Sequence, residues 1–186
     1  PKKSNRKPED YVRFQINRII KNLNLTKIYC VLIHNPGHFA KKSKYFYALK
    51  KLKQEGLIKN IGFSVYETNY LKSIIKKYDF DVVQLPYSII DRRFEETGCL
   101  KILKKKGIKI YARSVFLQGL LLHSYDKIPK KFKRKKRSYA WRSWRNWLKI
   151  NELSASDVCL NFVNSNKHID KIVVGVHNLK HLKKII

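Results

Sequence analysis

The sequence predicts an α/β fold in which helices cover a parallel sheet. Five short apolar runs recur along the 186 residues, each with the length and the β-branched or aromatic content of a buried strand. Stretches with apolar residues three and four positions apart lie between these runs, as in amphipathic helices. Because strands joined through helices run parallel, the pattern requires right-handed crossovers within one sheet, which could be open or closed.

The first predicted strand, Ile28–Ile33, ends at the histidine that organises the predicted site. Residues 1–8 are polar and basic and are predicted to be irregular, and a helix follows from Glu9. The run Ile28–Ile33 is almost unbroken, which is typical of a strand buried on both faces. His34 and an Asn-Pro-Gly turn follow, so the strand delivers an imidazole to the rim of the sheet, where parallel α/β folds keep their chemistry.

The next elements repeat this design. Ser43 is the predicted N-cap of a second helix, which Gly56 ends. The strand 61–65 follows, and apolar residues at helical spacing predict a helix over 67–78. The strand 81–86 is stopped by Pro86, which cannot donate to a sheet ladder.

The remaining elements follow from the same signals. A helix is predicted over 95–106, because Gly107 breaks the pattern there. Residues 108–113 alternate like a strand, and the apolar residues 114–122 follow them. The last predicted elements are a helix over 154–163, a strand over 172–176 and a helix from Asn178 onward with Leu179, Leu182, Ile185 and Ile186 on its inner face.

Composition sets limits on the function. The net charge of +29 would suit a polyanionic partner, but lysines are spread over every predicted helix, which fits a solvated surface equally well. Cys30, Cys99 and Cys159 form no C-x-x-C pair, so neither a disulfide framework nor a metal site is predicted. No apolar run reaches the length of a membrane span or of a signal peptide, which predicts a cytoplasmic protein.

Polar or small residues lie where the predicted strands end, at His34, Ser64, Gln84, Arg113 and Gly175. In a parallel sheet these positions converge on one edge, which is how a barrel builds a site from several loops. The alternative for His34 is a histidine that only caps its strand through a hydrogen bond. No strand is followed by G-x-G-x-x-G, so the Rossmann dinucleotide fingerprint is missing.

Five motifs in order resemble the aldo/keto reductase family of NAD(P)H-dependent oxidoreductases. The matching segments are Leu32–Pro36, Leu49–Ser64, Val83–Ser88, Gly107–Leu121 and Val173–Gly175. The resemblance implies one domain over residues 1–186, an incomplete (β/α)8 barrel whose five parallel strands correspond to strands 4 to 8 of the family. It also implies reduction of a small-molecule aldehyde or ketone to an alcohol.

The resemblance assigns roles to the strand ends. His34 matches the histidine that hydrogen-bonds the substrate carbonyl and stabilises the developing oxyanion, and Ser64 and Gln84 match the residues that hold the nicotinamide carboxamide. The stretch 114–119 would line the pyrophosphate, and the start of the last helix would meet the adenosine end. The further cofactor-binding residues that it implies are Arg113, Ser114, Phe116, Gly119, Gly175, Val176, His177 and His181.

Three positions depart from the family pattern. Val65 stands where an Asn usually follows the serine, and Arg113 stands where many members place an aromatic residue. Such an Arg can stack on the nicotinamide or pair with a phosphate. The family's adenine-contacting Asn falls on Ile185. His177, Lys180 and His181 stand where a 2'-phosphate would be read, which favours NADPH, with NADH as the other possibility.

The family's catalytic Tyr, Asp and Lys have no match in this sequence. In the family they lie on three strands that precede the one matched by Ile28–Ile33. The chain therefore looks like the C-terminal five-eighths of a reductase, and we expect this fragment to be inactive alone, because the Tyr donates a proton.

The segment 127–149 is a basic, Trp-containing insertion or helix. It has no acidic residue, contains the run Lys133–Arg137 and holds Trp141, Trp144 and Trp147. Aromatic residues interleaved with Arg can bind single-stranded nucleic acid. The i, i+3, i+6 spacing favours instead a helix whose Trp stripe packs inward. A basic nucleic-acid-binding module is thus the less favoured alternative, beside a non-catalytic barrel relic.

Overall fold

The computed structural model describes residues 7–34, 43–129, 135–183 and 185, without the side chains of 135–138 and 180. The helices in these residues are α1 (Pro8–Asn22), α2 (Lys44–Gln54), α3 (Thr68–Lys77), α4 (Arg93–Glu96), α5 (Cys99–Lys105), α6 (Lys135–Ile150), α7 (Ala155–Asn164) and α8 (Leu179–Lys183), with 3-10 turns η2 (Leu120–Leu122) and η3 (Tyr125–Lys127). The strands are β1 (Ile28–His34), β2 (Ile58–Ser64), β3 (Val82–Pro86), β4 (Lys109–Arg113) and β5 (Lys171–Ile172).

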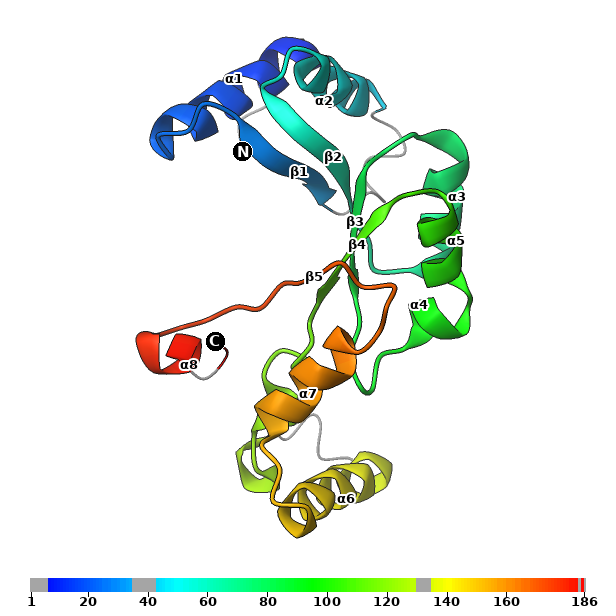
Figure 1. The fold of residues 1–186 in the computed structure, drawn as a ribbon, viewed down its shortest axis with the longest axis vertical. Helices are drawn as coiled ribbons and strands as arrows, with labels where there is room; N and C mark the ends of the chain where they lie inside the picture. The colour runs from blue at the N-terminus through cyan, green and yellow to red at the C-terminus, as the bar shows by residue number, and fades with distance from the viewer. Residues whose placement is uncertain (1–6, 35–42, 130–134, 184, 186) are drawn as a thin grey trace. The chain divides into compact units, whose positions relative to one another are not determined.

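The five strands form one parallel sheet in the order β1-β2-β3-β4-β5 (Figure 1). Spatial order therefore equals chain order, as in a (β/α)8 barrel, and the predicted α/β fold with five parallel strands is confirmed. The chain divides into two compact units. Unit 1 comprises Pro1–Leu85 and Phe94–Tyr111, and unit 2 comprises Pro86–Arg93 and Ala112–Ile186.

Phe63 on β2 lies at the centre of the core of unit 1. Its ring stacks on Phe46 of α2 at 5.4 Å between centroids and meets Phe80 edge-on at 5.1 Å. The helices α1 and α2 pack against each other, and α2 also packs against β2 (Figure 1). Phe46, Leu49 and Leu52 are buried on the face of α2 that meets this core.

Ion pairs fasten α1 to the end of α2. The guanidinium of Arg13 donates to both carboxylate oxygens of Glu55, at 2.7 and 2.6 Å, and Lys51 pairs with Glu9. The hydrogen bonds from Arg13 hold the pKa of the Glu55 carboxyl below its ordinary value. These pairs place a carboxylate beside two of the basic residues on this surface.

The prediction that β1 is buried on both faces is wrong. None of its residues is buried, and Tyr29 is 45% exposed. The reason is that β1 is the first strand in the sheet order and, among the described strands, has only β2 beside it. An apolar run indicates a strand, but its burial depends on the neighbours that the chain supplies.

Two element boundaries and one helix face also differ from the sequence predictions. The helix predicted over 95–106 is two helices, α4 and α5, separated at Gly98, which has a φ of +71°. The last strand has regular pairing only over Lys171–Ile172, although the Val173 N–H still donates to the carbonyl of Ala112 at 2.8 Å. The predicted inner face of α8 is exposed at Leu179 and Leu182.

Unit 2 has its own small core. Tyr87 stacks on Phe162 of α7 at 5.6 Å, and the Asn166 amide donates to the Tyr87 hydroxyl at 2.8 Å. Cys159 and Val163 are fully buried on the same helix. Among the described residues, no helix combines the length and apolar character that a membrane span needs.

The three cysteines are reduced thiols that differ in accessibility. Cys99 and Cys159 are buried, Cys30 is half-buried, and burial raises the pKa of the Cys159 thiol to about 11. Because only the thiolate reacts, we expect iodoacetamide at neutral pH to label Cys30 first and Cys159 only after unfolding, with a difference in rate of at least about a hundredfold. Mass spectrometry of a labelling time course measures this order, and early labelling of Cys159 would contradict it.

Candidate active site

Three predicted site residues meet at the C-terminal ends of β1, β2 and β3. In the strand register His34 lies opposite Ser64, and Ser64 lies opposite Gln84. The Ser64 hydroxyl donates to Oε1 of Gln84 at 3.3 Å. Parallel pairing in register therefore produces a row of imidazole, hydroxyl and amide groups across one edge of the sheet, as the sequence predicted.

Burial is greatest in the middle of this row, on β2. Ser64 is only 2% exposed, Gln84 is half-buried and His34 is exposed. The Tyr66 ring meets the His34 ring edge-on, with 6.0 Å between centroids. Tyr66 was not among the predicted site residues, although it lies two residues after Ser64, beyond the same strand end.

Gly62 allows β2 and β3 to approach each other below this row. A Cβ at Gly62 would lie 1.7 Å from the carbonyl oxygen of Val82 and 3.2 Å from the Leu32 side chain. Gly62 is opposite Val82 in the register, one pair before Phe63 and Val83. Only a glycine at this position permits the backbone contact that brings Ser64 beside Gln84.

In unit 2, four predicted residues lie at the end of β4 and in the loop that follows it. Arg113 ends β4, and its Nη1 donates to the Ser114 hydroxyl at 3.0 Å. The following loop contains four positive φ angles, at Ser114, Leu117, Gln118 and Gly119. Non-glycine residues rarely adopt this conformation, and such strained backbone gathers at ligand-binding sites. The sequence carries no signal for three of these angles.

The last predicted group follows β5. Gly175, Val176 and His177 are exposed in the segment before α8, and the rings of His177 and His181 meet edge-on at 6.2 Å. The helix α8 has five residues. A helix this short develops little dipole at its N-terminus, so the predicted phosphate binding by the start of this helix is not supported. The predictions for Asn35, Pro36, Ile186 and the side chain of Lys180 lie outside the described residues.

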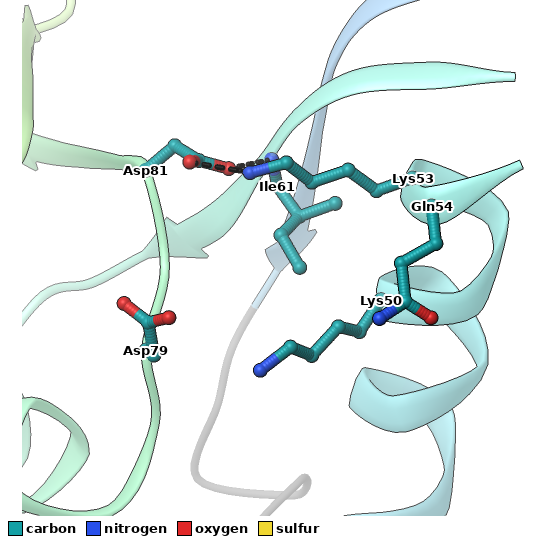
Figure 2. Close-up of a pocket in the computed structure, with 6 residues that line it drawn as sticks. All are labelled: Lys50, Lys53, Gln54, Ile61, Asp79 and Asp81. Carbon is teal, nitrogen blue, oxygen red and sulfur yellow. Dashed lines mark hydrogen bonds and ion pairs between the residues drawn. The ribbon is translucent and has the colours of Figure 1, made fainter. Parts of the chain in front are cut away.

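A pocket of about 180 Å³ lies at the opposite end of unit 1 (Figure 2). Asp81, just before β3, accepts two hydrogen bonds from Lys53 at 2.6 and 2.7 Å and one from the Ile61 N–H at 2.9 Å. Lys50 extends from α2 on the side of Asp79 (Figure 2). Because Asp81 joins α2, β2 and β3 at the end away from His34, we assign this pocket to stability.

We expect Asp81→Ala to lower the free energy of unfolding by about 2 kcal/mol, since the Ile61 N–H and Lys53 lose their acceptor. Asp79→Ala removes an exposed carboxylate from the same pocket and should change stability by less than about 0.5 kcal/mol. Urea denaturation of both variants measures the difference. Equal stabilities would show that Asp81 does not anchor the strands.

Among the described residues, no group of three or more His, Cys, Asp or Glu could hold a metal ion. The candidate site of unit 1 offers hydrogen bonding through Ser64 and Gln84 and an imidazole through His34. This donor set suits an amide and a carbonyl oxygen.

Several known proteins are similar to this chain in sequence. The model of the Aldo/keto reductase family matches residues 1–186. An uncharacterized oxidoreductase, YqkF, of Bacillus subtilis (strain 168) is 27% identical over 146 residues, which are 75% of this chain and 47% of the relative. The aldo-keto reductase yakc [NADP(+)] of Schizosaccharomyces pombe is 28% identical over 136 residues, 70% of this chain and 40% of the relative.

Solved structures agree in fold. The holo form of aldo-keto reductase AKR11C1 from Bacillus halodurans has a TM-score of 0.76 at 20% identity, covering 97% of this chain and 62% of that one. The glycerol dehydrogenase AKR11B4 from Gluconobacter oxydans has a TM-score of 0.71 at 17% identity, covering 97% and 64%. The chain thus spans about half the length of the curated relatives that it matches.

Proposed function

This chain belongs to the aldo/keto reductase family, and on that premise we propose that it carries the cofactor side of an NAD(P)H-dependent oxidoreductase that reduces an aldehyde or ketone to an alcohol. The observation that best supports this proposal is the register of His34, Ser64 and Gln84 on three adjacent strands. When bound, a reduced nicotinamide supplies the hydride for this class of reaction.

Ser64 and Gln84 hold the nicotinamide carboxamide in this proposal. A carboxamide presents one acceptor and two donors, and the Ser hydroxyl and the Gln amide offer the complementary groups. In the structure these two side chains hydrogen-bond each other, so both can exchange that bond for bonds to a ligand. Because Ser64 is deeply buried, its contact with the carboxamide has a fixed position. This contact determines which face of the nicotinamide ring is presented to the substrate.

His34 orients and polarises the carbonyl substrate. An N–H of its imidazole donates to the carbonyl oxygen and stabilises the charge that develops there during reduction. The exposure of His34 leaves the ring accessible to a substrate, and Tyr66 supports one side of it. A histidine that only capped β1 would need no such access.

The loop after β4 receives the cofactor phosphates. Turns that contain left-handed residues can direct successive backbone N–H groups toward one side, as in anion-binding nests, and residues 114–119 contain four positive φ angles. Arg113 supplies a cation beside Ser114. We assign the pyrophosphate to Arg113, Ser114, Phe116 and Gly119, and the adenosine end to Gly175 and Val176.

NADPH is the proposed cofactor, with His177 and His181 at the 2'-phosphate. The paired rings and the NADP(+) in the name of the S. pombe relative support this choice. We expect the double variant His177→Ala/His181→Ala to weaken NADPH binding by about tenfold and to leave NADH binding within about twofold, because only NADPH carries the extra phosphate. His168→Ala, outside this group, is the matched control.

Calorimetric titration of the chain with NADPH and with NADH tests the proposed function. We expect both to bind, NADPH more tightly, with each bound cofactor raising the melting temperature. If neither cofactor binds at millimolar concentration, the assignment of a cofactor site to this chain is wrong. Tighter binding of NADH would overturn only the choice of cofactor.

A further inference from the structure

One face of α6 is anchored to the rest of unit 2. The Trp144 indole N–H donates to the carbonyl of Leu121 at 3.1 Å, and Leu148 is 4% exposed. Trp141 is half-buried on the same side. The packing face predicted from the Trp spacing is therefore present for two of the three rings.

The third ring belongs to an outward face. Trp147 is 45% exposed, and Tyr139 and Ile150 are 78% and 71% exposed. Positions 139, 147 and 150 lie within about 80° of one another on a helix with 3.6 residues per turn. Trp147 also stacks on the anchored Trp144 at 5.8 Å, with 16° between the planes. A large aromatic surface is thus held in place rather than left mobile.

Cations flank these aromatic residues on one side of the helix. Arg142 and Lys149 are exposed on α6, Arg145 is half-buried, and the Arg142 guanidinium lies 5.0 Å from the Tyr125 ring centroid. Residues 127–149 include eleven Lys and Arg and no Asp or Glu. This stretch therefore contains no carboxylate that could pair with its own cations. At α1, by contrast, Arg13 pairs with Glu55 and Glu9 pairs with Lys51.

We propose that the outward face of α6 binds single-stranded nucleic acid, a function separate from the carbonyl reduction proposed above. Each exposed ring offers a stacking platform for one base, and Arg142 and Lys149 neutralise phosphates. A membrane surface fits less well, because Ser143 and Asn146 lie between the apolar side chains, leaving no broad apolar stripe to insert. An acidic peptide would use the charges but not the aromatic surface.

Fluorescence anisotropy of a short fluorescein-labelled oligothymidylate, titrated with the full chain, tests this proposal. We expect Trp147→Ala and Tyr139→Ala each to weaken binding by about tenfold, while Trp147→Phe retains most of the affinity, because stacking needs an aromatic face. Tyr139 has so little buried surface that its variant folds even if Trp147→Ala does not. Tryptophan emission reports on α6 alone, since all three tryptophans lie there, and should be quenched on binding.

Charge variants separate a site on α6 from the general basicity of the chain. Arg142→Gln/Lys149→Gln should lower the slope of log affinity against log salt by about 1.4, as expected for two lost phosphate contacts on a single strand. Lys101→Gln/Lys105→Gln removes the same charge from exposed positions on α5 and should leave the slope unchanged.

Three outcomes would overturn the proposal. Equal losses in the α5 and α6 charge variants would indicate binding by net charge alone. Full affinity in both Trp147→Ala and Tyr139→Ala would exclude stacking. Binding to vesicles of phosphatidylcholine and phosphatidylserine without binding to oligothymidylate would assign this face to a lipid surface instead.

Discussion

Replacing Gly62 with Ala is expected to lower the free energy of unfolding by about 4 kcal/mol or more, enough to unfold many small domains. The added Cβ would lie 1.7 Å from the Val82 carbonyl oxygen and 2.7 Å from its carbon. Both atoms belong to the backbone, so no side chain can rotate away, and β2 and β3 must separate. Since Phe63 and Ser64 follow directly, the change should disturb the core and the candidate site together.

Gly175→Ala is the matched control for this variant. The new Cβ would meet no atom within 4 Å, so stability should change by less than about 0.5 kcal/mol. Urea denaturation followed by circular dichroism measures both variants. If Gly62→Ala were as stable as the unchanged chain, the close approach of β2 and β3 would be wrong.

The 186-residue chain is expected to show no measurable carbonyl reduction with NADPH. Hydride transfer to a carbonyl leaves an alkoxide that needs a proton, and loss of the general acid costs about a hundredfold to ten-thousandfold in rate. In the described part of the chain no strand precedes β1, and the family's proton-donating Tyr has no counterpart in the sequence. NADPH absorbance with a generic aldehyde measures the rate.

A small residual rate would need a control for contaminating reductases. The variant His34→Ala, purified in the same way, provides this control, because the substitution does not change the activity of a contaminating reductase. Steady NADPH consumption that His34→Ala abolishes would contradict the expected inactivity while supporting the role of His34. Cofactor binding without turnover would instead favour a cofactor-binding reductase over a non-catalytic barrel relic, for which the Ser64–Gln84 pair would have no function.

The sequence predicted the strands because strand formation depends on local apolar content. The predicted strands 61–65, 81–86 and 108–113 overlap β2, β3 and β4, which all have neighbours on both sides. Burial at the edges could not be predicted, because it depends on partners. The run Ile28–Ile33 has the pattern of a buried strand, yet β1 has one neighbour among the described strands. At the other edge, β5 has regular pairing over only two residues.

The candidate site was predictable in part for a similar reason. Parallel pairing places strand ends together, so His34, Ser64 and Gln84 could be grouped from their positions alone. Tyr66 and the positive φ angles of Leu117 and Gln118 could not, because they depend on the course of loops after the strands. Gly98 has a φ of +71° and separates two helices. The apolar residues on either side of it continue one helical pattern, so the sequence did not indicate this boundary.

The most direct test of this account is calorimetric titration of NADPH into two glutamine variants. Gln84→Leu removes a proposed carboxamide contact and should weaken NADPH binding by about tenfold or more, because the polar carboxamide of the ligand would lose its hydrogen bond and face an apolar side chain. Gln54→Leu makes the same chemical change at the opposite end of unit 1, on the pocket of Figure 2, and should bind like the unchanged chain. Equal affinities for the two variants would contradict a nicotinamide site at the ends of β2 and β3.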